Sequence, residues 1–195
     1  MDESTRRARR KGETRERILD AAIACFVERG FEATTMHAIA ERADVARATV
    51  FNHFADKQAL LTGYLDRRRA RVLGLLQSAG ESSSDAGQTL LDAFAILAQE
   101  NERSRAETRE LLQAWLRTGG NASAGTSEQL LAAIVAAGQQ RGELRGELDT
   151  ELVARILFDA YVGVVIRWVA VDPPPFDLQA TLRDMVTTIL DGLRG

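Results

Sequence analysis

The chain has 195 residues, of which 45% are hydrophobic and 27% charged, and its formal net charge is −3. This composition is typical of a soluble globular protein, and the chain is long enough to form a stable hydrophobic core without disulfide bonds. A single cysteine, Cys25, excludes an internal disulfide framework, and with only two histidines there are too few ligands for a structural zinc site. We expect no metal, no cofactor, no membrane span and no secretory signal, and therefore a cytoplasmic protein.

The N-terminus carries a dense group of positive charges on a chain that is otherwise acidic. Five of the six residues at positions 6–11 are basic, and we call them the basic cluster: Arg6, Arg7, Arg9, Arg10 and Lys11. Such a cluster indicates a polyanionic partner at this end of the chain, although a solvated tail has the same composition. We expect residues 1–13 to form a flexible basic arm.

Apolar residues recur at helical spacing along the rest of the chain, and no alternating pattern indicates a strand. Gly30 is placed to end the first helix, Thr34 or Thr35 to cap the second, and Asp149 to cap the eighth. Loops rich in glycine and serine are expected at 78–87 and 119–127. The sequence therefore predicts an all-α fold with about nine helices, at 14–29, 36–43, 47–53, 57–77, 88–101, 104–118, 128–141, 150–171 and 178–193.

One stretch, Arg15 to Leu61, carries an ordered set of residues at dense spacing. After an apolar first helix come Gly30-Phe31, Thr34-Thr35, Ile39-Ala40, Val45, Thr49-Val50-Phe51, His53-Phe54, Lys57 and Leu60-Leu61. In these residues the sequence resembles the DNA-binding domain of the TetR family of bacterial transcriptional regulators. The resemblance implies a helix-turn-helix DNA-binding domain at 14–56, followed by a helical effector-binding and dimerisation domain at 57–195. The helix at 47–53 would enter the major groove of DNA.

Transferred position by position, the resemblance assigns DNA contacts to side chains of the helix-turn-helix. Arg47 and Asn52 would read base edges, Phe51 would pack on the DNA backbone, and Ala48 would permit close approach. Phosphate contacts fall on Thr49, His53, Lys57 and Thr35, while His37 lies where many relatives contact DNA and the basic cluster would enter the minor groove or follow the phosphates. Solvated surface or structural roles remain open for Arg47, Asn52, His53, Thr35 and His37.

Three positions depart from the family pattern. Asp44 stands at the turn where the family has glycine, Ala46 replaces the serine that caps the recognition helix, and Phe51 replaces a tyrosine. Asp tolerates a left-handed backbone better than most residues, so we expect the turn to survive. The lost cap and the lost phenolic contact affect the affinity for DNA rather than the fold.

The last two predicted helices carry more apolar surface than one protomer of this size needs, which favours a homodimer formed through them. Four aromatic side chains are candidates for lining an effector cavity, although core packing explains each as well: Phe94, Trp115, Tyr161 and Trp168.

The resemblance thus implies a homodimeric repressor that binds a palindromic operator and is released by a small-molecule effector, while activation stays possible. Two alternatives remain at this point. One is a helical adaptor whose head has lost DNA binding, and the other is an enzyme that uses His37 and Glu41, four residues apart on one helix.

Overall fold

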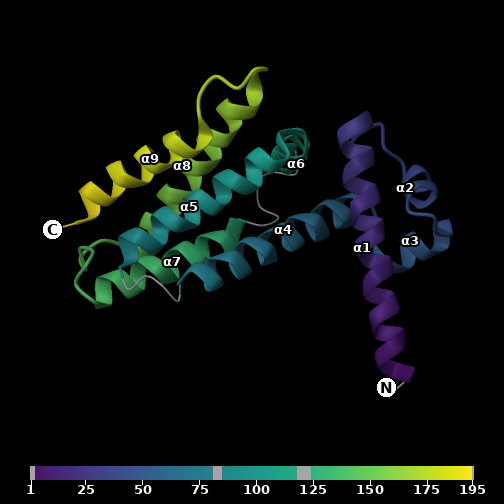
Figure 1. Cartoon of the computed structure of the whole chain (residues 1–195), viewed down its shortest axis with the longest axis horizontal. Helices are drawn as coiled ribbons and strands as arrows, with labels where there is room; N and C mark the ends of the chain where they lie inside the picture. The colour runs from purple at the N-terminus through teal and green to yellow at the C-terminus, as the bar shows by residue number, and fades with distance from the viewer. Residues whose placement is uncertain (1–2, 81–84, 118–123, 195) are drawn as a thin grey trace.

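The computed structural model describes residues 3–80, 85–117 and 124–194, and within these ranges all regular elements are α-helices (Figure 1). The all-α prediction is confirmed, and α2, α3, α6, α8 and α9 lie within one residue of their predicted bounds. Helices α4, α5 and α7 extend into the segments predicted as loops at 78–87 and 119–127, and residues 81–84 and 118–123 of the chain lie outside the described residues. The helices are α1 (Glu3–Arg29), α2 (Met36–Arg42), α3 (Arg47–His53), α4 (Lys57–Gly80), α5 (Ala86–Arg103), α6 (Arg105–Arg117), α7 (Ala124–Gln140), α8 (Thr150–Ala170) and α9 (Leu178–Leu193).

Helix α1 is longer than its apolar pattern indicates. It begins at Glu3 rather than at about residue 14, so residues 3–13, expected as a flexible arm, are helical. This segment has no apolar face to signal a helix, but arginine, lysine and glutamate are good helix formers. Arg9 also pairs with Glu13 one turn further along the helix, at 3.2 Å. The basic cluster is therefore exposed on the part of α1 that projects beyond α2 and α3 (Figure 1).

The predicted helix ends are formed by local backbone and side-chain hydrogen bonds. Gly30 follows α1 with φ of 79°, a left-handed conformation that glycine adopts without strain. Thr35 caps α2 by accepting a hydrogen bond from the amide of Ala38 at 3.1 Å. Asp149 caps α8 by accepting from two backbone amides of its first turn.

Helices α1, α2 and α3 and the start of α4 form a small head with its own hydrophobic core (Figure 1). Ile18, Leu19, Ile39 and Val50 are inaccessible to solvent in this core. Cys25 is buried there as a free cysteine and packs in this core. The head core also takes in Leu111 and Ala114 of α6, so one helix of the body packs directly against the head.

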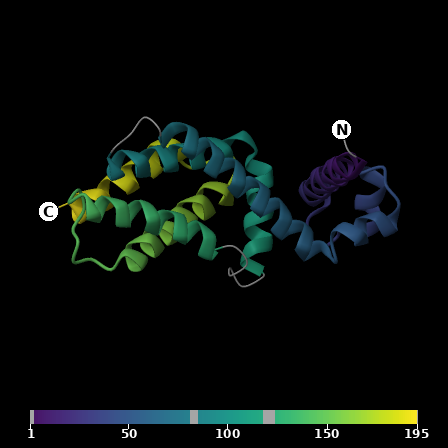
Figure 2. The same cartoon turned by 90° about the horizontal axis from the view of Figure 1, so that it is seen from below.

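The remaining helices form the body, which lies toward the other end of α4 from the head (Figure 2). Its core is built from α5, α7, α8 and α9, and its inaccessible side chains include Leu90, Leu157, Leu178 and Leu182. Among the described residues, no helix is both long and apolar enough to cross a membrane.

Candidate nucleic-acid interface and ligand cavity

The head contains a helix-turn-helix formed by α2 and α3. Val50 is buried under α3, and Val45 packs against the same core, which fixes the turn between the two helices. Asp44 has φ of 52°, so it takes the left-handed conformation expected where the family has glycine. Ala46 precedes α3 without a side-chain cap, as its methyl group requires. The two departures thus leave the helix-turn-helix intact.

The outward face of α3 carries the residues that were predicted to contact DNA. Arg47, Ala48, Phe51 and Asn52 are exposed, and Thr49 is half-buried. Phe51 exposes 43% of its surface, and the Arg47 guanidinium lies 5.5 Å from the centre of its ring. The cation and the ring thus form a pair one helical turn apart, on a side of α3 that no other part of the described chain covers.

His53 ends α3 in a half-buried position close to the basic part of α1. Burial lowers the pKa of His53, and the nearby charges of Lys11 and Arg15 lower it further. The imidazole is therefore neutral at pH 7. Because Lys11 acts on His53, the C-terminal end of the basic cluster lies close to the end of α3. Arg15 also stacks on the Phe54 ring at 4.7 Å.

Lys57, predicted as a phosphate contact, also bonds within the head. Its ammonium group donates to the carbonyl oxygens of Phe31 and Glu32 at 2.8 and 3.0 Å and lies 4.9 Å from the Phe31 ring centre. Lysine has three donors, so one N–H remains for another partner. Thus Lys57 ties α4 to the α1–α2 loop.

Thr35 and His37 are exposed at the start of α2. The hydroxyl oxygen of Thr35 is engaged as the helix cap. His37 Nε2 lies 3.4 Å from Glu41 Oε1, and both side chains are about two-thirds exposed. This pair is open to solvent on a two-turn helix.

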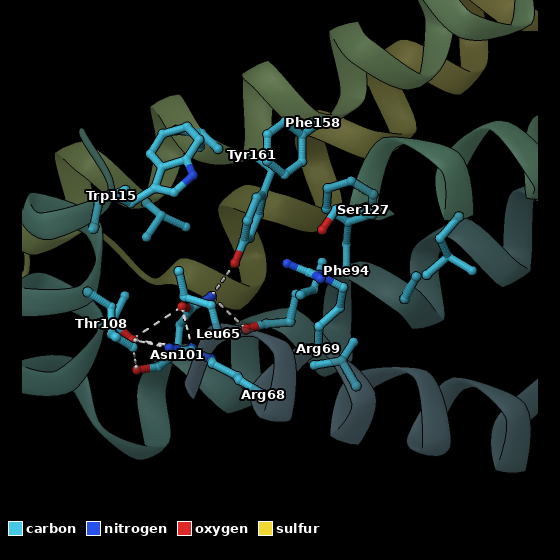
Figure 3. Close-up of a pocket in the computed structure, with 18 of the residues that line it drawn as sticks. Leu65, Arg68, Arg69, Phe94, Asn101, Thr108, Trp115, Ser127, Phe158 and Tyr161 are labelled. Atoms are coloured by element: carbon cyan, nitrogen blue, oxygen red, sulfur yellow. Dashed lines mark hydrogen bonds between the residues drawn. The ribbon is translucent and has the colours of Figure 1, made fainter. Parts of the chain in front are cut away.

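The body contains a partly open cavity of about 200 Å³, which is lined by α4, α5, α6, α7 and α8 (Figure 3). Its wall is largely apolar. Three of the four aromatic residues proposed from the sequence line it, namely Phe94, Trp115 and Tyr161. Phe158 joins them, and its ring meets Trp115 edge to face with ring centres 6.4 Å apart.

Trp168, the fourth aromatic candidate, does not line this cavity. It is buried near the end of α8, where the Arg105 guanidinium lies 5.3 Å from its ring and donates to its carbonyl oxygen at 2.9 Å. Arg105 also donates to the carbonyl of Val171, and Arg109 Nε donates to that of Val169 at 2.9 Å. Two arginines of α6 thus satisfy two of the free carbonyl groups in the last turn of α8 and that of Val171, which follows the helix.

Polar side chains gather on one side of the cavity and were not predicted from the sequence (Figure 3). Arg68 donates to Asn101 Oδ1 at 2.7 Å and to Thr108 Oγ1 at 3.3 Å. Asn101 Nδ2 donates to the Tyr161 hydroxyl oxygen at 2.8 Å and to the Leu97 carbonyl at 2.7 Å. A signal was present, because Asn101 and Thr108 are polar residues on otherwise apolar helix faces. Their convergence depends on how α5 and α6 pack.

Helix α4 connects the cavity to the head. Arg67 pairs with Glu16 at 2.9 Å and with Asp20 at 2.8 Å, both on α1, and the next residue is the cavity residue Arg68. Tyr64, one turn before, donates its hydroxyl to Glu107 of α6 at 2.6 Å. Burial and this bond raise the pKa of Tyr64 to about 12, so the donated proton stays in place at neutral pH.

An exposed helix of a helix-turn-helix, with cations beside it, defines a DNA-binding protein. Comparison with known families agrees at both ends of the chain. The family of bacterial regulatory proteins named tetR matches residues 18–63, and the C-terminal region of YsiA-like proteins matches residues 96–192. The chain belongs to the TetR family of bacterial transcriptional regulators. It is a DNA-binding regulator of transcription and not an enzyme.

Individual relatives extend over most of the chain. The transcriptional repressor KstR of Mycobacterium tuberculosis is 27% identical over 182 residues, which covers 92% of this chain and 81% of KstR. Thermus thermophilus FadR, a TetR-family repressor solved in complex with lauroyl-CoA, is 29% identical with a TM-score of 0.74 and covers 91% and 94% of the two chains. FadR of Bacillus halodurans shares the fold with a TM-score of 0.78 at 23% identity, covering 93% and 96%.

Proposed function

We propose that this regulator is a homodimeric repressor that binds a palindromic operator and is released by a small-molecule effector. The observation that carries the proposal is that one helix, α4, joins an exposed recognition helix to a largely apolar cavity in the body. Residues 14–56 would bind DNA, residues 57–195 would bind the effector and dimerise, and the helical segment before residue 14 would add phosphate contacts.

The DNA-binding part of the proposal rests on the exposed face of α3. Arg47 and Asn52 would read base edges, because both are exposed and carry the donors that such reading needs. Phe51 and Ala48 would lie against the backbone. Phosphates would be contacted by Thr49, His53, Thr35, His37, the remaining N–H of Lys57 and the basic cluster.

The homodimer is supported by an apolar stripe on α8. Leu152 and Ile156 are 44% and 48% exposed, although they lie four residues apart on the most apolar helix of the body. The outward residues of α9 are mainly polar, among them Arg183, Asp184 and Thr187. We therefore propose that α8 supplies the apolar centre of a two-fold interface and α9 its polar margin. Two heads in such a dimer would meet half-sites about 34–36 Å apart.

Release by an effector is supported by the contacts of α4 and α6. A ligand in the cavity touches α4 beside Arg67, which is paired with α1, and touches α6 beside Leu111, which belongs to the head core. Movement of either helix would therefore reorient the head and change the distance between the two recognition helices. The complex of the Thermus thermophilus relative with lauroyl-CoA supports the binding of a ligand by this regulator.

The proposal is tested by selecting binding sequences from a random duplex library with the full-length protein. We expect an inverted repeat, and we expect sedimentation of the complex to give two chains per duplex. Selected sequences without two-fold symmetry, or one chain per duplex, would contradict the homodimer. If no sequence is enriched above random DNA, operator recognition by α3 is wrong.

A further inference from the structure

We propose that the cavity binds a small hydrophobic monocarboxylic acid, whose carboxylate pairs with Arg68 while its apolar part contacts the aromatic wall. This inference rests on the proposed function, since it names the chemical class of the effector. The observation behind it is that the hydrogen-bond partners of the Arg68 guanidinium are neutral, so that its positive charge is not balanced by a carboxylate of the described residues.

The other arginines of α4 are all paired with carboxylates. On the same helix, Arg67 pairs with Glu16 and Asp20, Arg69 with Asp66 at 3.0 Å, and Arg71 with Glu100 at 3.5 Å. Arg68, in contrast, bonds only to the amide oxygen of Asn101 and the hydroxyl of Thr108. Among the described residues, no ion pair joins Arg68 to a carboxylate.

A half-buried cation with neutral partners favours an incoming anion. Asn101 and Thr108 are only 2% and 4% exposed, so the bonds of Arg68 lie in a region from which water is largely excluded. Charge attraction is stronger there than in water. A guanidinium has five N–H donors and matches a carboxylate with two parallel bonds. The bonds to Asn101 and Thr108 hold the planar group in place and still leave donors for a ligand.

The volume of the cavity and its aromatic wall determine the size and the apolar character of the remaining part of the ligand. A volume of about 200 Å³ is below the ~300–1,000 Å³ of sites for drug-sized molecules. The aromatic pairs Trp115–Phe158 and Phe94–Tyr161 stand opposite the polar side formed by Arg68 (Figure 3). The cavity therefore fits one apolar group and one anionic group. A single unneutralised cation matches a single negative charge, and Arg69 is already paired.

The test compares charged and neutral ligands of the same shape. Octanoate and 4-phenylbutyrate are titrated into the full-length protein by calorimetry, each beside its primary amide. Tryptophan fluorescence gives a second signal, because one of the two tryptophans, Trp115, lines the cavity. Each acid should bind at least about 10-fold more tightly than its amide, because a bond to a charged group stabilises the complex more than a neutral one. Binding of the amides as tightly as the acids, or of none of the probes, would overturn the proposal.

Variants of α4 locate the charge. Arg68→Gln should weaken binding of the acids by about 10- to 100-fold and leave the amides nearly unchanged. Arg71→Gln is the matched control, since it removes a charge from the same helix at an exposed position outside the cavity lining, and it should change neither. Equal loss in both variants would overturn the assignment to Arg68. If Arg68→Gln does not fold, the acid–amide comparison in the unmodified protein decides alone.

Operator release is measured separately, so that the two proposals can fail independently. An acid that binds through Arg68 but leaves operator binding unchanged would support the ligand class and contradict effector-driven release. A neutral compound that releases the operator while the acids do not bind would do the reverse.

Discussion

Replacement of Arg47 by alanine removes the only arginine on α3 and leaves the helix itself intact, since alanine is the better helix former. In the structure the Arg47 guanidinium lies over the Phe51 ring at 5.5 Å and is otherwise exposed. The side chain would have to leave this ring, at least in part, to reach a base. The binding free energy lost in Arg47→Ala is therefore the free energy of the base contact minus that of the ring contact, which Arg47 gives up when it binds DNA.

Both contributions have typical magnitudes. A bidentate contact between arginine and guanine discriminates by about 1–3 kcal/mol, and an exposed cation–π pair contributes about 0.5–1 kcal/mol. The difference is about 0.5–2 kcal/mol for each half-site. For two half-sites in a dimer this gives about 1–4 kcal/mol, or a loss of roughly 5- to 1,000-fold in affinity for the selected operator.

The assay is fluorescence anisotropy with the selected duplex and with a scrambled duplex of the same composition. Arg47→Ala should reduce the preference for the selected duplex far more than it reduces binding to the scrambled one. Arg42→Ala is the matched control, because Arg42 is an exposed arginine of the same helix-turn-helix that pairs with Glu28 at 2.6 Å, away from α3. An unchanged preference in Arg47→Ala, or an equal loss in Arg42→Ala, would refute the assignment.

Four further changes test the remaining contacts. Lys57→Met should lower the stability of the head by about 1–3 kcal/mol in thermal unfolding, because two loop carbonyls lose a charged donor; it should also flatten the salt dependence of DNA binding by about one unit, and an unchanged slope would restrict Lys57 to its structural contacts. Leu152→Glu combined with Ile156→Glu should give monomers in sedimentation with little loss of monomer stability, because both side chains are already half exposed; a persistent dimer would disprove the α8 interface. The lowered pKa of His53 means that its contribution to stability is complete above the ordinary value of 6.5 and is lost as pH falls through the lowered pKa; His53→Gln should reduce this acid-side loss in thermal unfolding, and an identical pH profile would contradict it. Deletion of residues 1–11 should weaken binding to selected and scrambled duplexes alike at low salt, and unchanged binding would show that the basic cluster makes no contact.

The helices and the helix-turn-helix could be predicted because their signals are local. Periodic apolar residues, Gly30 after α1 and Thr35 before α2 each determine structure within a few positions of themselves. The start of α1 was missed for the same reason. Residues 3–13 form a helix because their side chains favour one and because Arg9 pairs with Glu13. They carry no apolar stripe, so the periodic pattern does not indicate this helix.

The cavity was predicted only in part because its residues come from five helices. The sequence shows which residues are aromatic, but it does not show which side chains from other helices pack against them. Trp168 lies on the same helix as Tyr161, two turns further along, yet it packs beneath Arg105 rather than into the cavity. Arg68 gave no signal in a run of three arginines, because only the tertiary contacts of α4 distinguish its partners from those of Arg67 and Arg69.

Helix α6 belongs to two hydrophobic cores, since Leu111 and Ala114 complete the head while the same helix lines the cavity. A head cut off after α4 would expose to water the apolar surface on α1 that these two side chains cover. In a chimeric regulator that joins this head to a foreign sensor domain at the end of α4, the sensor domain would therefore pack poorly against α1. Exchanging α6 together with the head, or regrafting Leu111 and Ala114 onto the new sensor, would restore the fit.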